Sequence, residues 1–254
     1  MFANCNAGST AFWNKSPPLD SIVELMPPSF ALPSLVFFDA VGTLLHPEPP
    51  APAVYAAVGR RFGSRRDEAD ITARFRAAFR RQEEEDRAAG LRTDERREIA
   101  RWRAIVHEVL DDVAGVETCF QELYAHFARV DAWRCLPETG EVLAALAGRG
   151  HVLGIASNFD HRLRGLVESL PALRPVRYLV ISSEIGWRKP AAQFFEQMCR
   201  QAGSSAEQVL YVGDDPINDY GGAQAARVRA LLFNPRRSVE VPSDSCITSL
   251  SDLL

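Results

Sequence analysis

The sequence lacks the features that mark secreted, zinc-bound or membrane-spanning proteins. Its five cysteines are scattered and include no Cys-x-x-Cys pair, which argues against a disulfide framework or a zinc site and fits a reducing cytosol. No apolar stretch reaches the roughly 18 residues that a membrane helix needs. The N-terminus has neither the basic region nor the apolar core of a secretory signal. A net charge of −4 gives no general reason to expect nucleic acid or membrane binding, so we expect a cytoplasmic protein with neither partner.

What the chain does contain is enough apolar sequence for a sizeable core. Its 254 residues, 46% hydrophobic and 24% charged, can form one large α/β domain or a core with a modest insertion. Residues 1–33 are interpreted as an N-terminal extension, because paired prolines interrupt them at Pro17-Pro18 and Pro27-Pro28. We expect this extension to be poorly ordered or loosely docked.

Between residues 47 and 136 the apolar residues recur at helical spacing. A proline-rich linker, His46–Pro52, comes first and is expected to continue neither a strand nor a helix. Four or five amphipathic helices follow, with no convincing strand from residue 53 to residue 136. Between Arg60 and Arg103 these helices carry fourteen arginines and ten acidic residues. Such a mixture usually forms a solvated, ion-paired face, although some of the arginines could instead face a binding site and attract an anionic substrate.

The rest of the chain alternates between apolar runs and helical segments. The runs that predict strands are Leu35–Phe38, His151–Ser157, Tyr178–Ser182, Val209–Gly213 and Arg229–Phe233. Helices are expected near Glu141–Gly148, Arg162–Leu170, Pro190–Ala202 and Tyr220–Ala226, with a short closing helix in Ile247–Leu254. Strands joined by helical crossovers imply a doubly wound, parallel, five-stranded sheet. The predicted fold class is therefore α/β, with an all-helical insertion after the first strand.

Carboxylates follow two of these predicted strands directly. Asp39 ends the first run, and Gly42 allows the sharp turn after it. Because ligands bind at the carboxyl ends of parallel strands, Asp39 is expected where chemistry occurs. Asp214, Asp215 and Asp219 crowd the end of the fourth run. Carboxylates this close repel one another unless a cation or proton compensates, and Mg²⁺ prefers one or two such ligands together with water or substrate oxygens.

Polar residues also stand at the end of the second run and before a later helix. Ser157 and Asn158 end that run, where a hydroxyl and free backbone N–H groups suit phosphate oxygens. Taken alone, Ser157 is more often explained as the N-cap of the following helix. Lys189 precedes Pro190, which is expected at the first position of a helix, so that the turn places the ammonium group. A lone lysine is by itself usually a surface charge.

Together these positions resemble the four motifs of the haloacid dehalogenase (HAD) superfamily. In the family's order they are Asp39-Ala40-Val41-Gly42-Thr43, Ser157 at its strand end, Lys189-Pro190, and Gly213-Asp214 with Asp219. The resemblance implies a Rossmann-like core with a cap domain. The gap of 118 residues between the first two motifs has room for a cap, and the next gap of 32 does not. This arrangement is typical of the helical C1-cap branch (subfamily IA), so the core is assigned to 34–46 and 137–254 and the cap to 47–136.

The resemblance also implies roles for individual residues. Asp39 would be the nucleophile that forms a covalent aspartyl intermediate, with Ser157 and Lys189 as further catalytic residues. The implied substrate-binding residues are Thr43, Ser157, Asn158 and Lys189. The implied ligands of Mg²⁺ are Asp39, the backbone carbonyl of Val41, Asp214 and Asp219. The expected substrate is a small phosphorylated metabolite, and the sequence indicates no oligomeric state.

Val41 departs from the phosphatase form of the first motif, Asp-x-Asp-x-Thr. In phosphatases of the family the second aspartate protonates the leaving oxygen, and such a group typically contributes about 10²–10⁴-fold. Valine cannot carry that proton. True dehalogenases also lack this aspartate, but they need no metal and usually replace the carboxylate that is retained here as Asp214. The sequence therefore favours a Mg²⁺-dependent phosphatase weakened at Val41, with a metal-independent dehalogenase-like hydrolase or a catalytically degenerate binding protein as alternatives.

Overall fold

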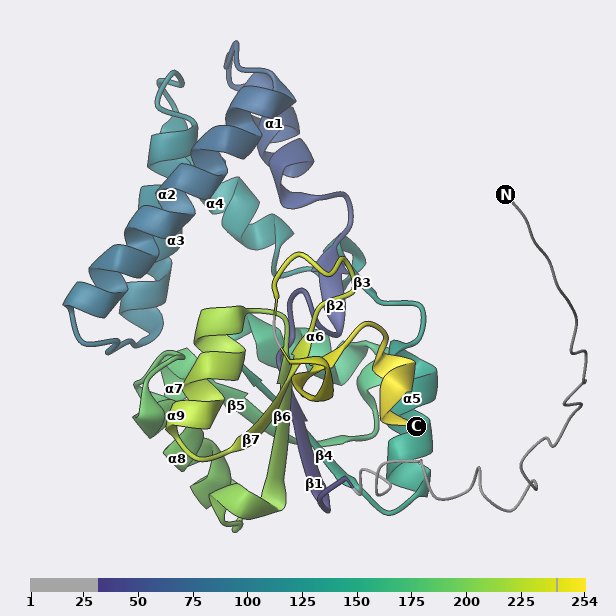
Figure 1. The fold of residues 1–254 in the computed structure, drawn as a ribbon. Helices are drawn as coiled ribbons and strands as arrows, with labels where there is room; N and C mark the ends of the chain where they lie inside the picture. Colours follow the sequence, from purple (N-terminus) through teal and green to yellow (C-terminus); the bar gives the residue numbers. More distant parts are fainter. Residues whose placement is uncertain (1–31, 241) are drawn as a thin grey trace, which may run out of the picture. The chain divides into compact units, whose positions relative to one another are not determined.

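The computed structural model describes residues 32–240 and 242–254, so the predictions for residues 1–31 lie outside it. Its centre is a parallel sheet with the strand order β5-β4-β1-β6-β7-β8 (Figure 1). The strands are β1 (Leu35–Phe38), β4 (Val152–Ser157), β5 (Val176–Ile181), β6 (Val209–Gly213), β7 (Arg229–Phe233) and β8 (Cys246–Ile247). The predicted doubly wound parallel α/β sheet is confirmed. All four residues of β1 are buried at its centre, as expected of a strand covered on both faces.

Successive residues of β1 face opposite sides of the sheet, and each side is covered by its own helices. Val36 and Phe38 share a core with helices α5 (Thr139–Gly148) and α6 (Arg162–Ser169). Leu35 and Phe37 share another core with α8 (Ala192–Gln201) and α9 (Gly222–Ala225). This division follows from the period-two geometry of a strand. The result is a three-layer core in which the carboxyl end of β1 lies between those of β4 and β6.

The sheet has six strands rather than the predicted five. Strand β8 pairs in parallel with β7 through Leu232 opposite Cys246 and Phe233 opposite Ile247. It includes the first residue of the tail that was expected to form a closing helix, and only Leu250–Leu253 form a helical turn. Two residues are too few to show a period-two pattern, so β8 depends on its neighbouring strand rather than on a local signal.

A short antiparallel ribbon of β2 (Leu45–Pro47) and β3 (Trp133–Cys135) frames the helical insertion. The ribbon contradicts two predictions, because His46–Pro52 was expected to form no strand or helix and residues 53–136 no strand. Proline is tolerated at the edge of a ribbon, where its missing N–H is not needed. Strand β3 is only three residues long and is formed by its pairing. Helix α1 (Ala51–Arg61) begins inside the expected linker, with proline in its first turn, where the N–H has no helical partner.

Four helices lie between the two strands of this ribbon, and we call them the cap helices. They are α1, α2 (Glu68–Ala88), α3 (Glu95–Val109) and α4 (Val116–His126). Their apolar faces pack on one another in a core that includes Ile71, Ile105 and Leu123, as the helical spacing predicts. Among the described residues no helix is both long enough and apolar enough to cross a membrane.

The packing of β1 against β4 gives a testable prediction at Gly154. A Cβ atom at this position would overlap the ring of Phe37 on the adjacent strand. We predict that Gly154→Ala lowers the free energy of unfolding by about 1–3 kcal/mol, as overpacking of a filled core does. Urea denaturation followed by circular dichroism measures the change.

Gly165 in α6 provides the matched control, because within the described residues nothing beyond its own helix backbone and chain neighbours lies within 4 Å of its Cβ position. Alanine is also the better helix former, so Gly165→Ala should leave the free energy of unfolding unchanged or raise it. Equal losses in the two variants would contradict the tight approach of Phe37 to Gly154.

Candidate active site

The carboxyl ends of β1, β4 and β6 bring the predicted site residues together. Asp39 directly follows β1, and its backbone N–H donates to the carbonyl oxygen of Val212 at 2.8 Å, which extends the pairing with β6. One carboxylate oxygen from each of Asp39, Asp214 and Asp219 lies within 4.8 Å of the others. Ser157 is the last residue of β4 and borders the same space. The strand order of the sheet, rather than proximity in sequence, therefore assembles the cluster.

The ammonium group of Lys189 lies between two of these carboxylates. Its Nζ donates to Oδ1 of Asp39 at 2.7 Å and to Oδ1 of Asp219 at 2.5 Å, and the side chain is only 3% exposed. Burial lowers the pKa of Lys189, but the charges of Asp219 and Asp39 outweigh burial and the net pKa is raised. The lysine is therefore held in its charged form beside Asp39.

The backbone of Lys189 is fixed by the side chain of Asn158. The amide oxygen of Asn158 accepts from the Lys189 N–H at 2.7 Å, and its nitrogen donates to the Lys189 carbonyl at 3.0 Å. Pro190, joined to Lys189 by a cis peptide bond, does not begin a helix as predicted. A turn intervenes, and α8 begins only at Ala192, because these hydrogen bonds hold the preceding residues outside helical geometry. Contact between Asn158 and substrate stays a prediction.

Tyr211 is a part of the site that the sequence analysis missed. It is completely buried in β6, and its hydroxyl accepts from Nζ of Lys189 at 2.8 Å while lying 2.7 Å from the carbonyl oxygen of Ala156, to which it donates. Burial and the neighbouring carboxylates raise the pKa of Tyr211 well above its usual value, so the phenol stays neutral. A single hydroxyl in an otherwise apolar strand is the signal that could have found it, since a buried phenol needs a partner.

The turn after β1 contacts the first carboxylate of the acidic turn. The hydroxyl of Thr43 donates to Oδ1 of Asp214 at 3.0 Å. Gly42 has a φ of 95°, and a Cβ atom there would overlap the Asp214 carboxylate, so the turn requires glycine. Thr43 is fully buried and does not border the cavity, so its contact with substrate stays a prediction. Val41 does border the cavity.

Asp219 is held from two sides, unlike Asp214. Its Oδ1 accepts from Lys189, and its Oδ2 accepts from the backbone N–H of Asp215 at 3.0 Å. Asp215 in turn caps the π-helical turn Pro216–Gly221 by accepting two backbone N–H bonds. With both of its oxygens engaged, Asp219 is better placed as an outer partner of a cation than as a direct ligand.

The donor set of this cluster fits a hard divalent cation. Desolvation and then the charges of Asp39 and Asp219 raise the pKa of Asp214 to about 7, even though its carboxyl opens onto the cavity. Desolvation, together with Asp39, raises the pKa of Asp219 to about 6 against the opposing effect of Lys189. Both raised pKa values mean that the ionised carboxylates have too little positive charge near them. Oxygen ligands in this number are typical of Mg²⁺, Ca²⁺ or Mn²⁺ sites rather than of zinc.

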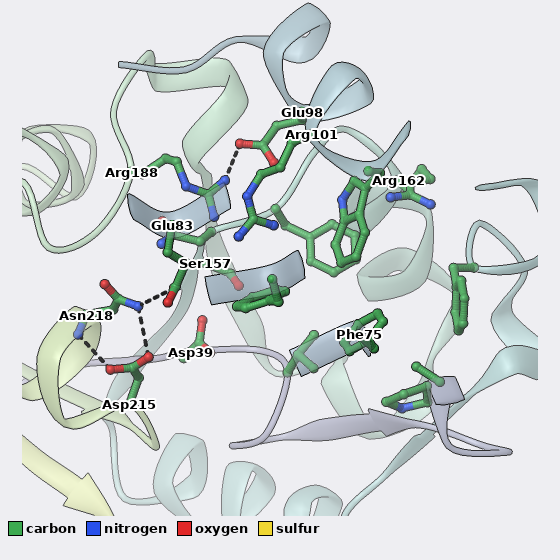
Figure 2. A pocket seen from close by; sticks show the side chains of 18 of the residues that line it. Asp39, Phe75, Glu83, Glu98, Arg101, Ser157, Arg162, Arg188, Asp215 and Asn218 are labelled. Carbon is green, nitrogen blue, oxygen red and sulfur yellow. Dashed lines mark hydrogen bonds and ion pairs between the residues drawn. The ribbon is translucent and has the colours of Figure 1, made fainter. Parts of the chain in front are cut away.

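The cluster forms one end of a cavity of about 400 Å³ that continues among the cap helices (Figure 2). Ser157, Asn158 and Val41 border it on the side of the sheet, and aromatic side chains border it on the side of the cap helices. Of the fourteen arginines between Arg60 and Arg103, all within the described residues, Arg101 is the one that borders the cavity. The dense charge of the cap helices is thus mainly a solvent-facing, ion-paired surface.

Buried ion pairs join the cap helices to the residue before Lys189. Arg188 pairs with Glu98 of α3 and, at 3.4 Å, with Asp86 of α2. Its backbone N–H also donates to the carbonyl oxygen of Leu91 at 2.9 Å. Further contacts between the cap helices and the sheet rim are Glu83 with Asn218 and Glu95 with His161.

A family model described as a haloacid dehalogenase-like hydrolase matches residues 33–227. The human haloacid dehalogenase-like hydrolase domain-containing protein 3 is 26% identical over 231 residues, which covers 87% of this chain and 92% of the human protein. Among solved structures, the HAD-hydrolase YfnB from Bacillus subtilis, bound to magnesium, matches with a TM-score of 0.69 and 18% identity over 88% of this chain and 97% of YfnB. The L-2-haloacid dehalogenase from Xanthobacter autotrophicus matches with a TM-score of 0.68 and 18% identity over 87% and 97%.

The raised pKa of Asp214 predicts how stability depends on pH when metal is removed. In the unfolded chain an aspartate titrates near pH 3.9, so between about pH 4 and pH 7 the folded protein binds more protons than the unfolded one. The contribution of Asp214 to the free energy of unfolding therefore falls as pH rises through this window and is constant above about pH 7.

Urea denaturation in EDTA at a series of pH values measures this contribution as the difference between wild type and Asp214→Asn. The variant should lose stability less steeply from pH 5 to pH 7 than the wild type. Added MgCl₂ should also flatten the wild-type curve, because a bound cation stabilises the ionised carboxylates. Parallel curves for the two proteins would contradict the assignment.

Proposed function

Because the chain belongs to the haloacid dehalogenase-like hydrolases, we propose that it is a Mg²⁺-dependent phosphatase acting on a small phosphorylated metabolite. The observation that carries this proposal is the charge of the cluster. Three carboxylates meet one ammonium group, which leaves two uncompensated negative charges. A phosphate dianion would be repelled by them, whereas one divalent cation balances them.

Asp39 is proposed as the nucleophile. The Lys189 ammonium holds its Oδ1, and its other oxygen accepts no hydrogen bond from the described residues. In the proposed reaction this oxygen attacks phosphorus while the ester P–O bond breaks, so the phosphoryl group passes to Asp39 and the alcohol leaves. Water then cleaves the aspartyl phosphate, which releases inorganic phosphate and restores Asp39.

Three other side chains are proposed to support this reaction. Lys189 stays protonated and offsets charge on the phosphoryl oxygens. Ser157, at the end of β4, offers a hydroxyl donor toward the phosphoryl group. Tyr211 acts through Lys189, since it fixes the position of the ammonium group rather than contacting the substrate.

The proposed cation would be held by Asp39, Asp214 and the backbone carbonyl of Val41, with Asp219 as its outer partner. When bound, it would supply Lewis-acid polarisation of a phosphoryl oxygen. Val41 offers no proton to the leaving oxygen, which must therefore take its proton from solvent. The proposal consequently favours esters whose leaving group is already a weak base.

A first test is hydrolysis of phenyl phosphate beside an alkyl phosphate such as glycerol phosphate. With Mg²⁺ we expect release of phosphate from the aryl ester far ahead of the alkyl ester, because phenolate needs less protonation. EDTA and the variant Asp39→Asn should each abolish the activity. Release of halide from a short 2-haloacid without metal, with no phosphate release, would instead identify a dehalogenase.

A second test restores the missing proton donor. Val41→Asp should raise turnover of the alkyl ester by at least about 10-fold, toward the roughly 10²–10⁴-fold typical of general acid–base groups. Val41→Asn is the matched control, because asparagine has nearly the size and polarity of aspartate but no ionisable proton. It should give no gain in turnover. The same gain in both variants would show that polarity, rather than proton transfer, is responsible.

A dehalogenase-like activity is the second candidate, and Val41 is the observation that favours it. A hydrolase that displaces halide needs no general acid for its leaving group, and the apolar wall of the cavity suits a carbon–halogen bond. The carboxyl groups of Asp214 and Asp219 weigh against it, since crowding them beside Asp39 is costly unless a cation joins them. A protein that only binds its ligand would be inert in both assays.

A further inference from the structure

The cavity is much larger and more apolar than a phosphate group requires. Beyond the carboxylates it is walled by aromatic side chains that come mostly from the cap helices and the ribbon (Figure 2). Among them are Tyr55, Phe75, Phe79, Trp102, Phe127 and Trp133. Such a wall stabilises a flat apolar body by burying its surface and by ring–ring contact.

One cation in this apolar wall has an unused hydrogen-bond donor. Arg101 of α3 is only 1% exposed, and Figure 2 shows its side chain pointing into the cavity. Its Nε donates to Oδ2 of Asp86 at 3.1 Å, and the guanidinium lies over the ring of Phe79, 4.4 Å from its centroid. Its Nη2 is buried and has no partner among the described residues. An unsatisfied buried charged donor is costly, so a bound group that accepts from it is favoured.

The charges around Arg101 favour an anionic acceptor over a neutral one. In this network Asp86 pairs with Arg97, Arg101 and Arg188, while Glu98 also pairs with Arg188 and Glu85 with Arg97 at 3.7 Å. Among the described residues Asp86 is the one carboxylate that pairs with Arg101, and a charged donor bonds more strongly to an anionic acceptor than to a neutral one. Burial and the charge of Arg188 lower the pKa of Arg101 to about 10, which still leaves it protonated near neutral pH. The hydroxyl of Tyr124, on the same cavity wall, is a second buried polar atom with no hydrogen-bond partner in the described part of the chain.

We propose that the substrate is a phosphomonoester with a flat apolar or aromatic body and a remote anionic oxygen that accepts a hydrogen bond from Nη2 of Arg101. The inference rests on the proposed phosphatase function for the phosphate end alone. The phosphate binds at Asp39 and Lys189, the ring packs in the aromatic wall, and the anion accepts a hydrogen bond from the buried Nη2 of Arg101. Arg101 is thus a specificity-determining residue supplied by the cap helices.

The test uses benzylphosphonate, whose C–P bond is not hydrolysed, with its 3-carboxy, 4-carboxy and 4-carbamoyl derivatives. Calorimetric titration of the full chain with Mg²⁺ measures the dissociation constant of each ligand. We expect at least one carboxy derivative to bind about 10- to 100-fold more tightly than benzylphosphonate, the range of one hydrogen bond to a charged group. The neutral carbamoyl derivative should gain less.

Arg101→Met should bring the ratio between the carboxy derivative and benzylphosphonate close to one. Arg96→Met, on the exposed face of the same helix, is the matched control and should keep the wild-type ratio. Arg101→Lys retains the charge but not the planar fork, so it should keep part of the gain. If Arg101→Met fails to fold by circular dichroism, the wild-type ligand series and Arg101→Lys still decide the question.

The outcomes separate this inference from the proposed function. Binding of benzylphosphonate with no gain for either carboxy isomer would overturn the inference and leave the phosphatase proposal standing. Binding of the carboxy derivatives alone, lost in Arg101→Met, would support the anion site and count against phosphate binding at Asp39. No binding of any ligand would overturn both.

Discussion

An ammonium ion buried between two carboxylates is the constraint on which the rest of the structure depends. Lys189 can stay charged away from water only because Asp39 and Asp219 lie within hydrogen-bond distance, and these two can lie so close only because the lysine separates them. The elements that carry these residues must therefore lie at the same edge of the sheet. They are β1, β6 and the turn before α8. A parallel sheet meets this requirement, because it places the carboxyl ends of its strands side by side.

Sequence reasoning found the features whose signal is local. Four apolar residues ending in Asp39, and a cluster of carboxylates after β6, could be identified without knowledge of their neighbours. The features it missed are those that exist only in contact with something else. Strands β3 and β8 are formed by pairing, the hydroxyl of Tyr211 matters because Lys189 is beside it, and Arg101 differs from thirteen other arginines only in its burial. The composition does set Lys189 apart from the other basic residues. Only two of the 29 are lysines, Lys15 and Lys189.

The two walls of the cavity come from different parts of this chain. The rim of the sheet supplies the carboxylates, the ammonium group and the hydroxyl of Ser157, while the helical insertion supplies the aromatic wall. Because the insertion contributes little to the core of the sheet, its lining residues can change without disturbing the charged cluster. Val41 borders the cavity beside the carboxylates, so the side chain at this position affects the volume of the cavity. In the proposed reaction it also decides whether the leaving oxygen receives a proton from the protein.

Arg188 connects the helical insertion to the rim of the sheet. It is the residue before Lys189. Its buried guanidinium pairs with α2 and α3, and its backbone N–H donates to Leu91 in the loop between these two helices. Moving the helices away from the sheet would break both ion pairs of Arg188, whereas Asp86 would keep Arg97 and Arg101 as partners. The peptide segment that carries Lys189 is therefore braced twice, by Asn158 on the side of the sheet and, through its neighbour Arg188, by the helical insertion.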